Sequence, residues 1–264
     1  MMSEIECCRV DIWEPIVVPA HAPLFKPERM RTLGNYFRTP FDVDGSLKWE
    51  TTIAASDCTF SQGSEIAAWW SGFDLPLTFT PPDTAWNGKW FMILAQDPLR
   101  QIKNDPALTV TTPWVFHNAG QRELRFRKRV WWLADAIIKA GYGVYISDAN
   151  KLYLCADKKS KVNPVKSKDT LAAERHVLTN EIRLLADQGL ECVVGFGNSA
   201  TTASREILSD FGLKVPVNSH PHPTARFFDF KAHYGTVDGG ARVTANAIIA
   251  EVAQVSGVKL SPHS

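Results

Sequence analysis

Short apolar runs alternate with amphipathic stretches from Lys89 onward, and this alternation constrains the fold more than any other feature. The apolar runs predict strands at 90–95, 143–148, 191–195 and 214–218. The amphipathic stretches predict helices at 121–140, 170–188, 199–210 and 241–255. Strands that are joined through helices pair in parallel and are covered on both faces. We therefore expect an α/β fold with three αβα layers and a central four-stranded parallel sheet.

Apolar residues at helical spacing support two of these helices most directly. One set is Val130, Leu133, Ile137 and Ile138, and the other is Leu171, Leu178, Ile182 and Leu185. Glycines follow the predicted helices, at 141, 189 and 212, where a chain turns from a helix toward a strand.

Residues 1–88 carry a different pattern, because prolines interrupt most candidate elements there. Short helices near 28–37 and 64–71 are what remains. We expect this part to be an irregular elaboration of a single domain that covers 1–264, with its parallel-sheet core at 89–264.

Charge and cysteine content exclude several classes of protein. The chain has 29 Lys and Arg against 28 Asp and Glu, a net charge of +1, so nucleic-acid binding must use local patches. Five cysteines without a Cys-x-x-Cys pair argue against a disulfide framework or a zinc site and indicate a reducing, cytoplasmic location. No apolar run approaches the roughly 20 residues that span a bilayer. We expect no membrane partner, no metal and no cofactor.

Two predicted strands end in residues that can carry chemistry. Asp97 follows the strand at 90–95, and His220 follows the strand at 214–218. Because the carboxyl ends of parallel strands meet at one edge, we expect this carboxylate and this imidazole to face one crevice. Each has a structural alternative: Asp97-Pro98 is also a good helix start, and the His-Pro-His-Pro run at 220–223 is also a stiff turn.

The segment 195–200, Gly-Phe-Gly-Asn-Ser-Ala, fits the letters of a dinucleotide-binding fingerprint. Such a fingerprint belongs in the first βαβ unit, with an acidic residue near the end of the next strand. Here only one strand follows, and it ends in Asn218-Ser219-His220, which argues against this function.

Lysines gather in the loop after the predicted strand at 143–148, at Lys158, Lys159, Lys161, Lys166 and Lys168. A second basic run spans 122–129. Both are typical of solvated surface, but the loop follows the edge that would hold Asp97 and His220, where phosphates can bind.

Several segments from Lys89 onward resemble the uracil-DNA glycosylase superfamily, most closely its family 1, in the same order along the chain. Ala-Gln-Asp-Pro-Leu at 95–99 resembles the water-activating Gly-Gln-Asp-Pro-Tyr motif, and His-Pro-His-Pro at 220–223 resembles His-Pro-Ser-Pro. The strand at 144–149 is similar to the one that ends in the uracil-reading Asn. The segments 181–185 and 193–200 are similar to elements that precede the His motif.

The resemblance implies hydrolysis of the N-glycosidic bond of a uracil flipped out of DNA. Asp97 would orient water and favour the positive charge that develops on the sugar. His220 would hydrogen-bond the pyrimidine O2 as negative charge grows on the leaving base.

The resemblance also implies residues that contact the base and the DNA. Trp114, or second to it Phe116, would stack on the base, although both aromatics also suit plain core packing. The expected base-contacting set is Gln96, Pro98, Trp114, Phe116, Asp148 and Asn150. The expected DNA-contacting set is Lys158, Lys159, Lys161, Pro221, His222, Pro223, Thr224, Arg226 and Phe227.

Three residues depart from the family pattern. Asp148 stands where the family has Asn, and a carboxylate offers no donor to uracil O4, so a protonated Asp148 or Asn150 would have to donate instead. An ionised Asp148 would rather accept from the amine of cytosine. Leu99 replaces the Tyr that crowds out the thymine methyl group, and Thr224 replaces the apolar wedge.

The sequence thus predicts a monomeric uracil-DNA glycosylase that acts in base excision repair on DNA containing uracil. One alternative is a glycosylase with altered base preference. Another is a catalytically silent member of the same fold that binds DNA or a protein. A hydrolase of free nucleosides on a similar sheet is a further alternative.

Overall fold

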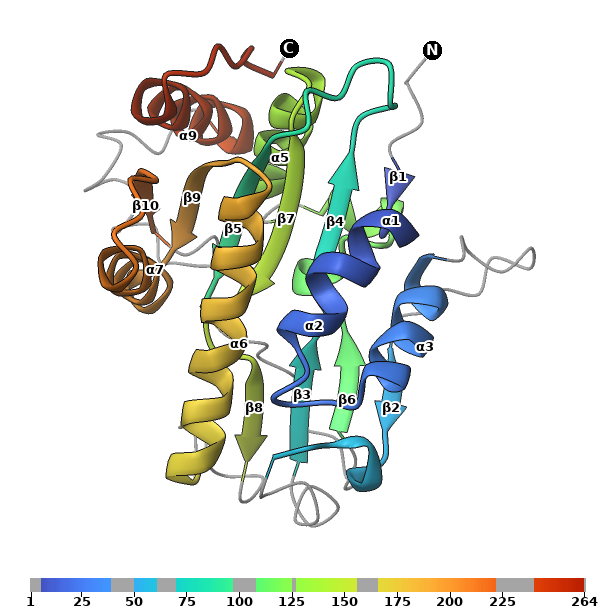
Figure 1. Ribbon diagram of the computed structural model, residues 1–264. Helices are drawn as coiled ribbons and strands as arrows, with labels where there is room; N and C mark the ends of the chain where they lie inside the picture. The colour runs from blue at the N-terminus through green and yellow to red at the C-terminus, as the bar shows by residue number, and fades with distance from the viewer. Residues whose placement is uncertain are drawn as a thin grey trace.

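The computed structural model describes residues 6–38, 50–60, 70–96, 108–124, 127–155, 166–221 and 240–263. Its strands form two sheets with helices packed around them (Figure 1). The predicted α/β class is confirmed. None of the described helices is long and apolar enough to cross a membrane.

Within the described ranges, the larger sheet has six strands. Their order is β1 (Glu6–Cys7), β4 (Leu77–Thr80), β7 (Gly143–Asp148), β5 (Trp90–Ala95), β9 (Leu190–Phe196) and β10 (Val217–His220). The neighbours β7, β5, β9 and β10 run parallel, while β4 is antiparallel to β7 and β1 is antiparallel to β4. The sheet is therefore mixed and larger than the four-stranded parallel sheet that the sequence predicted.

The smaller sheet has four strands in the order β2 (Thr51–Ile53), β6 (Leu108–Thr111), β3 (Trp70–Asp74) and β8 (Leu152–Cys155). The strands β1, β2, β3 and β4 all lie within residues 1–88. The prediction that this part is irregular was therefore wrong. Prolines there bound the elements: Pro76 separates β3 from β4, since a proline cannot donate to the ladder. The helix expected near 28–37 is α3 (Pro27–Arg38).

A long antiparallel ribbon joins the two sheets. β3 continues into β4 on one side of the ribbon, and β7 continues into β8 on the other. Phe73 pairs with Leu152, and Leu77 pairs with Ile146. The β3–β4 side therefore advances four residues between these pairs, whereas the β7–β8 side advances six. The surplus lies on the β7–β8 side and forms a bulged corner, which bends the ribbon.

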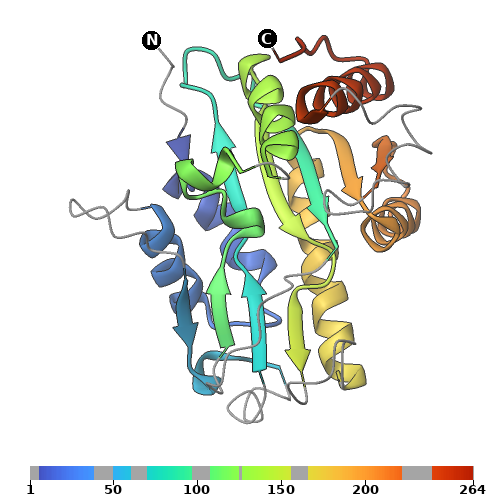
Figure 2. The ribbon, with the colours of Figure 1, turned by 180° about the vertical axis from the view of Figure 1, so that it is seen from behind.

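Helices cover both faces of the larger sheet. On one face lie α1 (Val10–Ile12), the π-helix η1 (Trp13–Val17), α2 (Val18–Ala20), α6 (Lys168–Asp187) and α7 (Asn198–Asp210), and α6 extends alongside the smaller sheet as well (Figure 1). The opposite face carries α4 (Ala119–Arg122), α5 (Arg127–Lys139) and α9 (Gly240–Ser256), seen from behind in Figure 2. Two short 3-10 helices, η2 (Ala55–Asp57) and η4 (Pro113–Val115), complete the described elements.

Local sequence accounts for the ends of several helices. Ser167 caps α6 by accepting a hydrogen bond from the amide of Thr170, and Asn118 caps α4 through the amide of Gln121. Where the sequence predicted one helix over 121–140, the structure has two helices, α4 and α5. Leu171, expected on the buried face of α6, is 50% exposed.

Burial explains the composition of the central strands. Every residue of β5 and of β7 is buried, because each strand has neighbours on both sides and helices on both faces. A polar residue inside these strands must therefore find its partner within the fold.

Candidate functional site

The order of the parallel strands creates a topological switch point at their carboxyl ends. The connection from β5 to its neighbour β7 includes α5 on one face, whereas the connection from β9 to its neighbour β10 includes α7 on the other face. Open α/β sheets bind ligands at such a switch point. The residues that end β5, β9 and the strands beside them are the candidate site.

Strand register places four residues in one row at this edge. Asp148 pairs with Ala95, and Phe196 pairs with His220. Leu94 pairs with Gly195, so Ala95 lies beside Phe196. Residues in register on parallel strands share a face, here the face of α5 and α9. Asp148 and His220 are three strand spacings apart, about 14 Å between backbones, so they lie at the two ends of the row without touching.

His220 is buried, and its environment is partly aromatic and partly acidic. Its ring lies 5.6 Å from that of Phe196, centroid to centroid, at 35°. On α9, Oε2 of Glu251 lies 3.6 Å from Nδ1 of His220. The carbonyl of His220 accepts a hydrogen bond from the amide of Gly197, which fixes the end of β10 against the end of β9.

Trp114 reaches the same row from the smaller sheet. β6 leads directly into η4, and the Trp114 ring packs edge-on against Phe196 with a centroid distance of 6.0 Å. Trp114 and Val115 both adopt positive φ, at 53° and 59°. Positive φ is strained for a β-branched residue such as Val115, and such strain gathers at functional segments. Trp114 is half-buried, whereas Phe116 is fully buried against Trp131 and belongs to the core.

The backbone brings Gln96 and Asn150 together behind this row. The amide of Asn150 donates to the carbonyl of Gln96 at 3.0 Å. Gly197, at φ +97°, lets β9 turn beside them, and a Cβ there would lie 3.1 Å from Oε1 of Gln96. The turn at Gly197 thus provides space for the Gln96 side chain.

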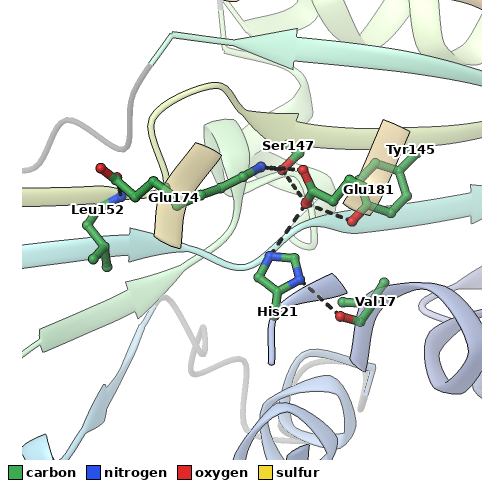
Figure 3. A network of polar contacts seen from close by, with 8 residues as sticks. Val17, His21, Tyr145, Ser147, Leu152, Glu174 and Glu181 are labelled. Carbon is green, nitrogen blue, oxygen red and sulfur yellow. Dashed lines mark hydrogen bonds and ion pairs between the residues drawn. The ribbon is translucent and has the colours of Figure 1, made fainter. Parts of the chain in front are cut away.

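The opposite face of β7 holds a buried polar network at the ribbon corner (Figure 3). Glu181 of α6 accepts hydrogen bonds from the hydroxyl of Tyr145 at 2.8 Å and of Ser147 at 2.9 Å. Lys151 is fully buried, and its ammonium group pairs with Glu181 and donates to Ser147 at 2.7 Å. His21 completes the network, with Nε2 3.4 Å from Oε1 of Glu181.

Burial controls protonation in this network. Burial lowers the pKa of His21 to about 4. The nearby Glu181 carboxylate raises this pKa, but by less than burial lowers it, and the charge of Lys151 opposes the carboxylate. His21 is therefore neutral at pH 7, with Nδ1 donating to the carbonyl of Val17 at 3.0 Å. Burial and the Glu181 charge together raise the pKa of Tyr145, which keeps its proton and acts as a donor.

A second ion pair fixes the start of β8. Glu174 accepts from the backbone amide of Leu152 at 2.6 Å and from Lys166 at 2.8 Å. Lys166 was expected in a basic, phosphate-binding loop, but its side chain is nearly buried and paired with Glu174. It is not available to a phosphate.

Most of the predicted DNA-contacting residues lie outside the described parts of the chain. The same holds for the predicted water-activating residue and its neighbour. The complete set is Asp97, Pro98, Lys158, Lys159, Lys161, His222, Pro223, Thr224, Arg226 and Phe227. Pro221 is described and follows β10 directly.

Of the described candidates, the structure brings His220 and Trp114 together through Phe196 and places Asp148 at the other end of the row. Sequence reasoning missed two residues of this group. Phe196 carried a signal, because it directly follows the predicted strand at 191–195, just as His220 follows the predicted strand at 214–218. Glu251 carried none, since it lies on a helix 31 positions after His220.

Other chemistry has little support in the described residues. They contain no group of three His, Cys, Asp or Glu that could hold a metal ion. Burial raises the pKa of Cys58 and of Cys192 to about 12, so both thiols keep their protons at neutral pH. A cavity of about 240 Å³ lies between α5 and the C-terminal segment, lined by Trp132, Lys139 and His263 among others, and away from the row.

The sequence matches no family model and no curated protein.

Proposed function

We propose that this chain is a DNA glycosylase that hydrolyses the N-glycosidic bond of uracil flipped out of DNA. The observation that carries the proposal is the row at the carboxyl edge, where His220 and Asp148 lie at the two ends and Phe196 and Trp114 lie between or beside them. An imidazole, a carboxylate and a half-buried indole at one switch point suit a planar, polar ring such as a nucleobase.

In the proposed reaction, the bond between the sugar C1′ and the base nitrogen breaks, and its electron pair leaves with the base. Water adds to C1′ and loses a proton. His220 would hydrogen-bond the O2 of the leaving uracil, where charge grows only as the bond breaks, so this contact lowers the barrier. Asp97 is the proposed water-orienting carboxylate, from its place directly after Gln96.

Excision assays on uracil-containing single- and double-stranded oligonucleotides test this proposal. We expect His220→Ala and Asp97→Asn each to lower the excision rate by about 10² to 10⁴ while DNA binding is retained. His176→Ala is the matched control, since His176 is exposed on α6, and it should excise at the wild-type rate.

The same assay separates the alternatives. Wild-type protein that binds DNA but releases no base at all would contradict the proposal and favour a silent binding protein. Release of bases from free nucleosides but not from DNA would favour a nucleoside hydrolase.

A further inference from the structure

The buried ring of Phe196 contacts two other rings of the row. Phe196 is the last residue of β9. Its ring meets the Trp114 indole edge-on, at 84° and with 6.0 Å between centroids, and it lies 5.6 Å from the His220 ring. Trp114 belongs to η4, which directly follows β6 of the smaller sheet. The contact between Phe196 and Trp114 therefore joins the larger sheet to a segment that the smaller sheet supplies.

The backbone that carries this indole is strained. Trp114 and Val115 have φ angles of 53° and 59°, in the left-handed region that β-branched residues such as Val115 avoid. A strained conformation persists only where the surrounding structure holds it. A segment released from such contacts relaxes to negative φ, and here that change would carry the Trp114 indole away from the row.

The residues on either side of the strained pair are fixed. Before it, Thr112 is buried, and its hydroxyl lies 2.7 Å from Nδ1 of His117. After it, Phe116 is buried against Trp131, and the carbonyl of Phe116 accepts a hydrogen bond from Nε of Arg122 at 2.7 Å. These contacts fix where the segment begins and ends. The direction of the half-buried indole between them depends on the rings that it packs against.

We infer that Phe196 is a positioning residue that holds Trp114 and its strained backbone in the pose that stacks on the flipped base. This inference rests on the proposed function for the contact with the base. Trp114 also packs on Phe116, at 5.4 Å and 34°, but Phe116 belongs to the same segment, so Phe196 is the ring that ties the indole to the row. Aromatic pairs prefer such edge-on geometry, which an aliphatic side chain does not impose.

A preset indole is useful for binding a flipped base. A side chain that is already held in its bound pose does not lose rotamer freedom when the ligand arrives, so more of the stacking energy appears as affinity. A site also keeps its geometry best when neighbouring packing locks the rotamers of the residues that contact the ligand. Phe196, buried at the end of a central strand, provides such packing for Trp114.

Backbone coupling constants of isotope-labelled protein report φ and test the inference without any substrate. We expect positive φ at Trp114 and Val115 in the wild type and negative φ at both in Phe196→Leu. Phe91→Leu is the matched control, because Phe91 is fully buried in the neighbouring strand β5 and meets Tyr142 edge-on, at 5.2 Å and 88°. Both substitutions should lower the melting temperature by similar amounts, but only Phe196→Leu should change the two φ angles.

Excision kinetics on uracil-containing oligonucleotides test the consequence for the substrate. We expect Phe196→Leu to raise KM about tenfold, the size of effect that a lost base–aromatic stack produces, with a smaller change in kcat. Phe91→Leu should leave KM unchanged. In a Trp114→Leu background, Phe196→Leu should raise KM no further, because Phe196 acts through Trp114.

A second substitution in η4 separates positioning from lost packing. Asparagine adopts positive φ far more readily than valine does, and the Val115 side chain is only half-buried. In Phe196→Leu, Val115→Asn should therefore restore positive φ at both positions and bring KM most of the way back to the wild-type value. A substitution in η4 does not refill space lost beside Phe196, so recovery supports the positioning role and its absence contradicts it.

The two proposals fail in different ways. Positive φ that persists at Trp114 and Val115 in Phe196→Leu overturns the inference, whatever the excision rates. The same relaxation in Phe91→Leu overturns it as well, because the change would then follow from general loss of stability. Wild-type protein without excision, whose φ angles change in Phe196→Leu alone, contradicts the proposed function and supports the positioning of Trp114 by Phe196.

Discussion

At the scale of single residues, the alternation of a strand assigns neighbours to different tasks. Ser147 and Asp148 are adjacent in β7, yet Ser147 points into the buried network with Glu181 and Asp148 lies in the row with His220. Successive side chains of a strand face opposite sides of the sheet. The network thus holds the end of β7 from one face, while Asp148 lies in the row on the other face.

Asp148→Asn tests whether this residue contacts the base. We expect the variant to excise uracil about tenfold faster, because an amide donates to uracil O4 where a carboxylate repels it, a difference of about 1.4 kcal/mol. The rate is measured on oligonucleotides with uracil or with cytosine at one position. Asp135→Asn, also buried but on α5, serves as the control. Equal uracil rates in wild type and Asp148→Asn, with cytosine untouched by both, would mean that Asp148 does not contact the base.

At the scale of elements, α6 organises the corner between the two sheets. Glu174 and Glu181 are seven residues apart and therefore share one face of the helix. Glu174 fixes the first amide of β8, and Glu181 binds the end of β7 and the Lys151 ammonium group. One helix thereby defines both sides of the bulged corner that carries Asp148 and Asn150.

Lys151→Met tests the contribution of this corner to stability. Its removal leaves the Glu181 carboxylate buried without its cation, so we expect the free energy of unfolding to fall by about 3–5 kcal/mol. Denaturant unfolding measures the change. Lys139→Met is the matched control: Lys139 is 68% exposed in its pair with Asp135, and its loss should cost less than about 1 kcal/mol. Equal losses in the two variants would show that the buried pair does not hold the corner.

At the scale of the whole molecule, the N-terminal part is built into the fold. β1 and β4 extend the larger sheet, β2 and β3 belong to the smaller one, and α2 packs on α6. His21 follows α2 and contacts the network at the corner, so a residue from the N-terminal part meets residues from between 145 and 181 there. The protonation of His21 is therefore linked to folding of the whole chain.

The stability of the protein should fall on acidification because of His21. Its pKa drops from an ordinary 6.5 to about 4 on folding, so the unfolded state binds a proton in this interval that the folded state does not. Stability contributed by neutral His21 is complete above pH 6.5 and is lost as the pH falls toward 4, by up to about 3 kcal/mol. Unfolding measured from pH 7 to 4 should show a shallower decline for His21→Gln than for the wild type. Parallel declines would contradict the assigned protonation.

The sequence by itself determined the four parallel strands and most of the helices after Lys89, within a few residues, but not β6 and β8. The strands at 90–95 and 143–148 and the helices over 168–187 and 198–210 follow from apolar periodicity, which is a local property. It also identified His220, Asp148 and Trp114 as candidates, since each follows or ends a recognisable segment. Prolines in residues 1–88 were wrongly taken as a sign of irregular chain, because proline marks the ends of short strands as well as loops.

Only the tertiary structure decided which strands pair and which polar groups meet. The mixed sheet, the second sheet and the bulged corner depend on pairings between segments far apart in sequence, for which β3 and β8 carry no local signal. Lys151 meets Glu181 across 30 positions and His220 meets Glu251 across 31, and each contact exists only because a helix packs on a particular face of the sheet. Periodicity indicates which face of a helix or strand is buried. Packing alone decides which residues lie against that face.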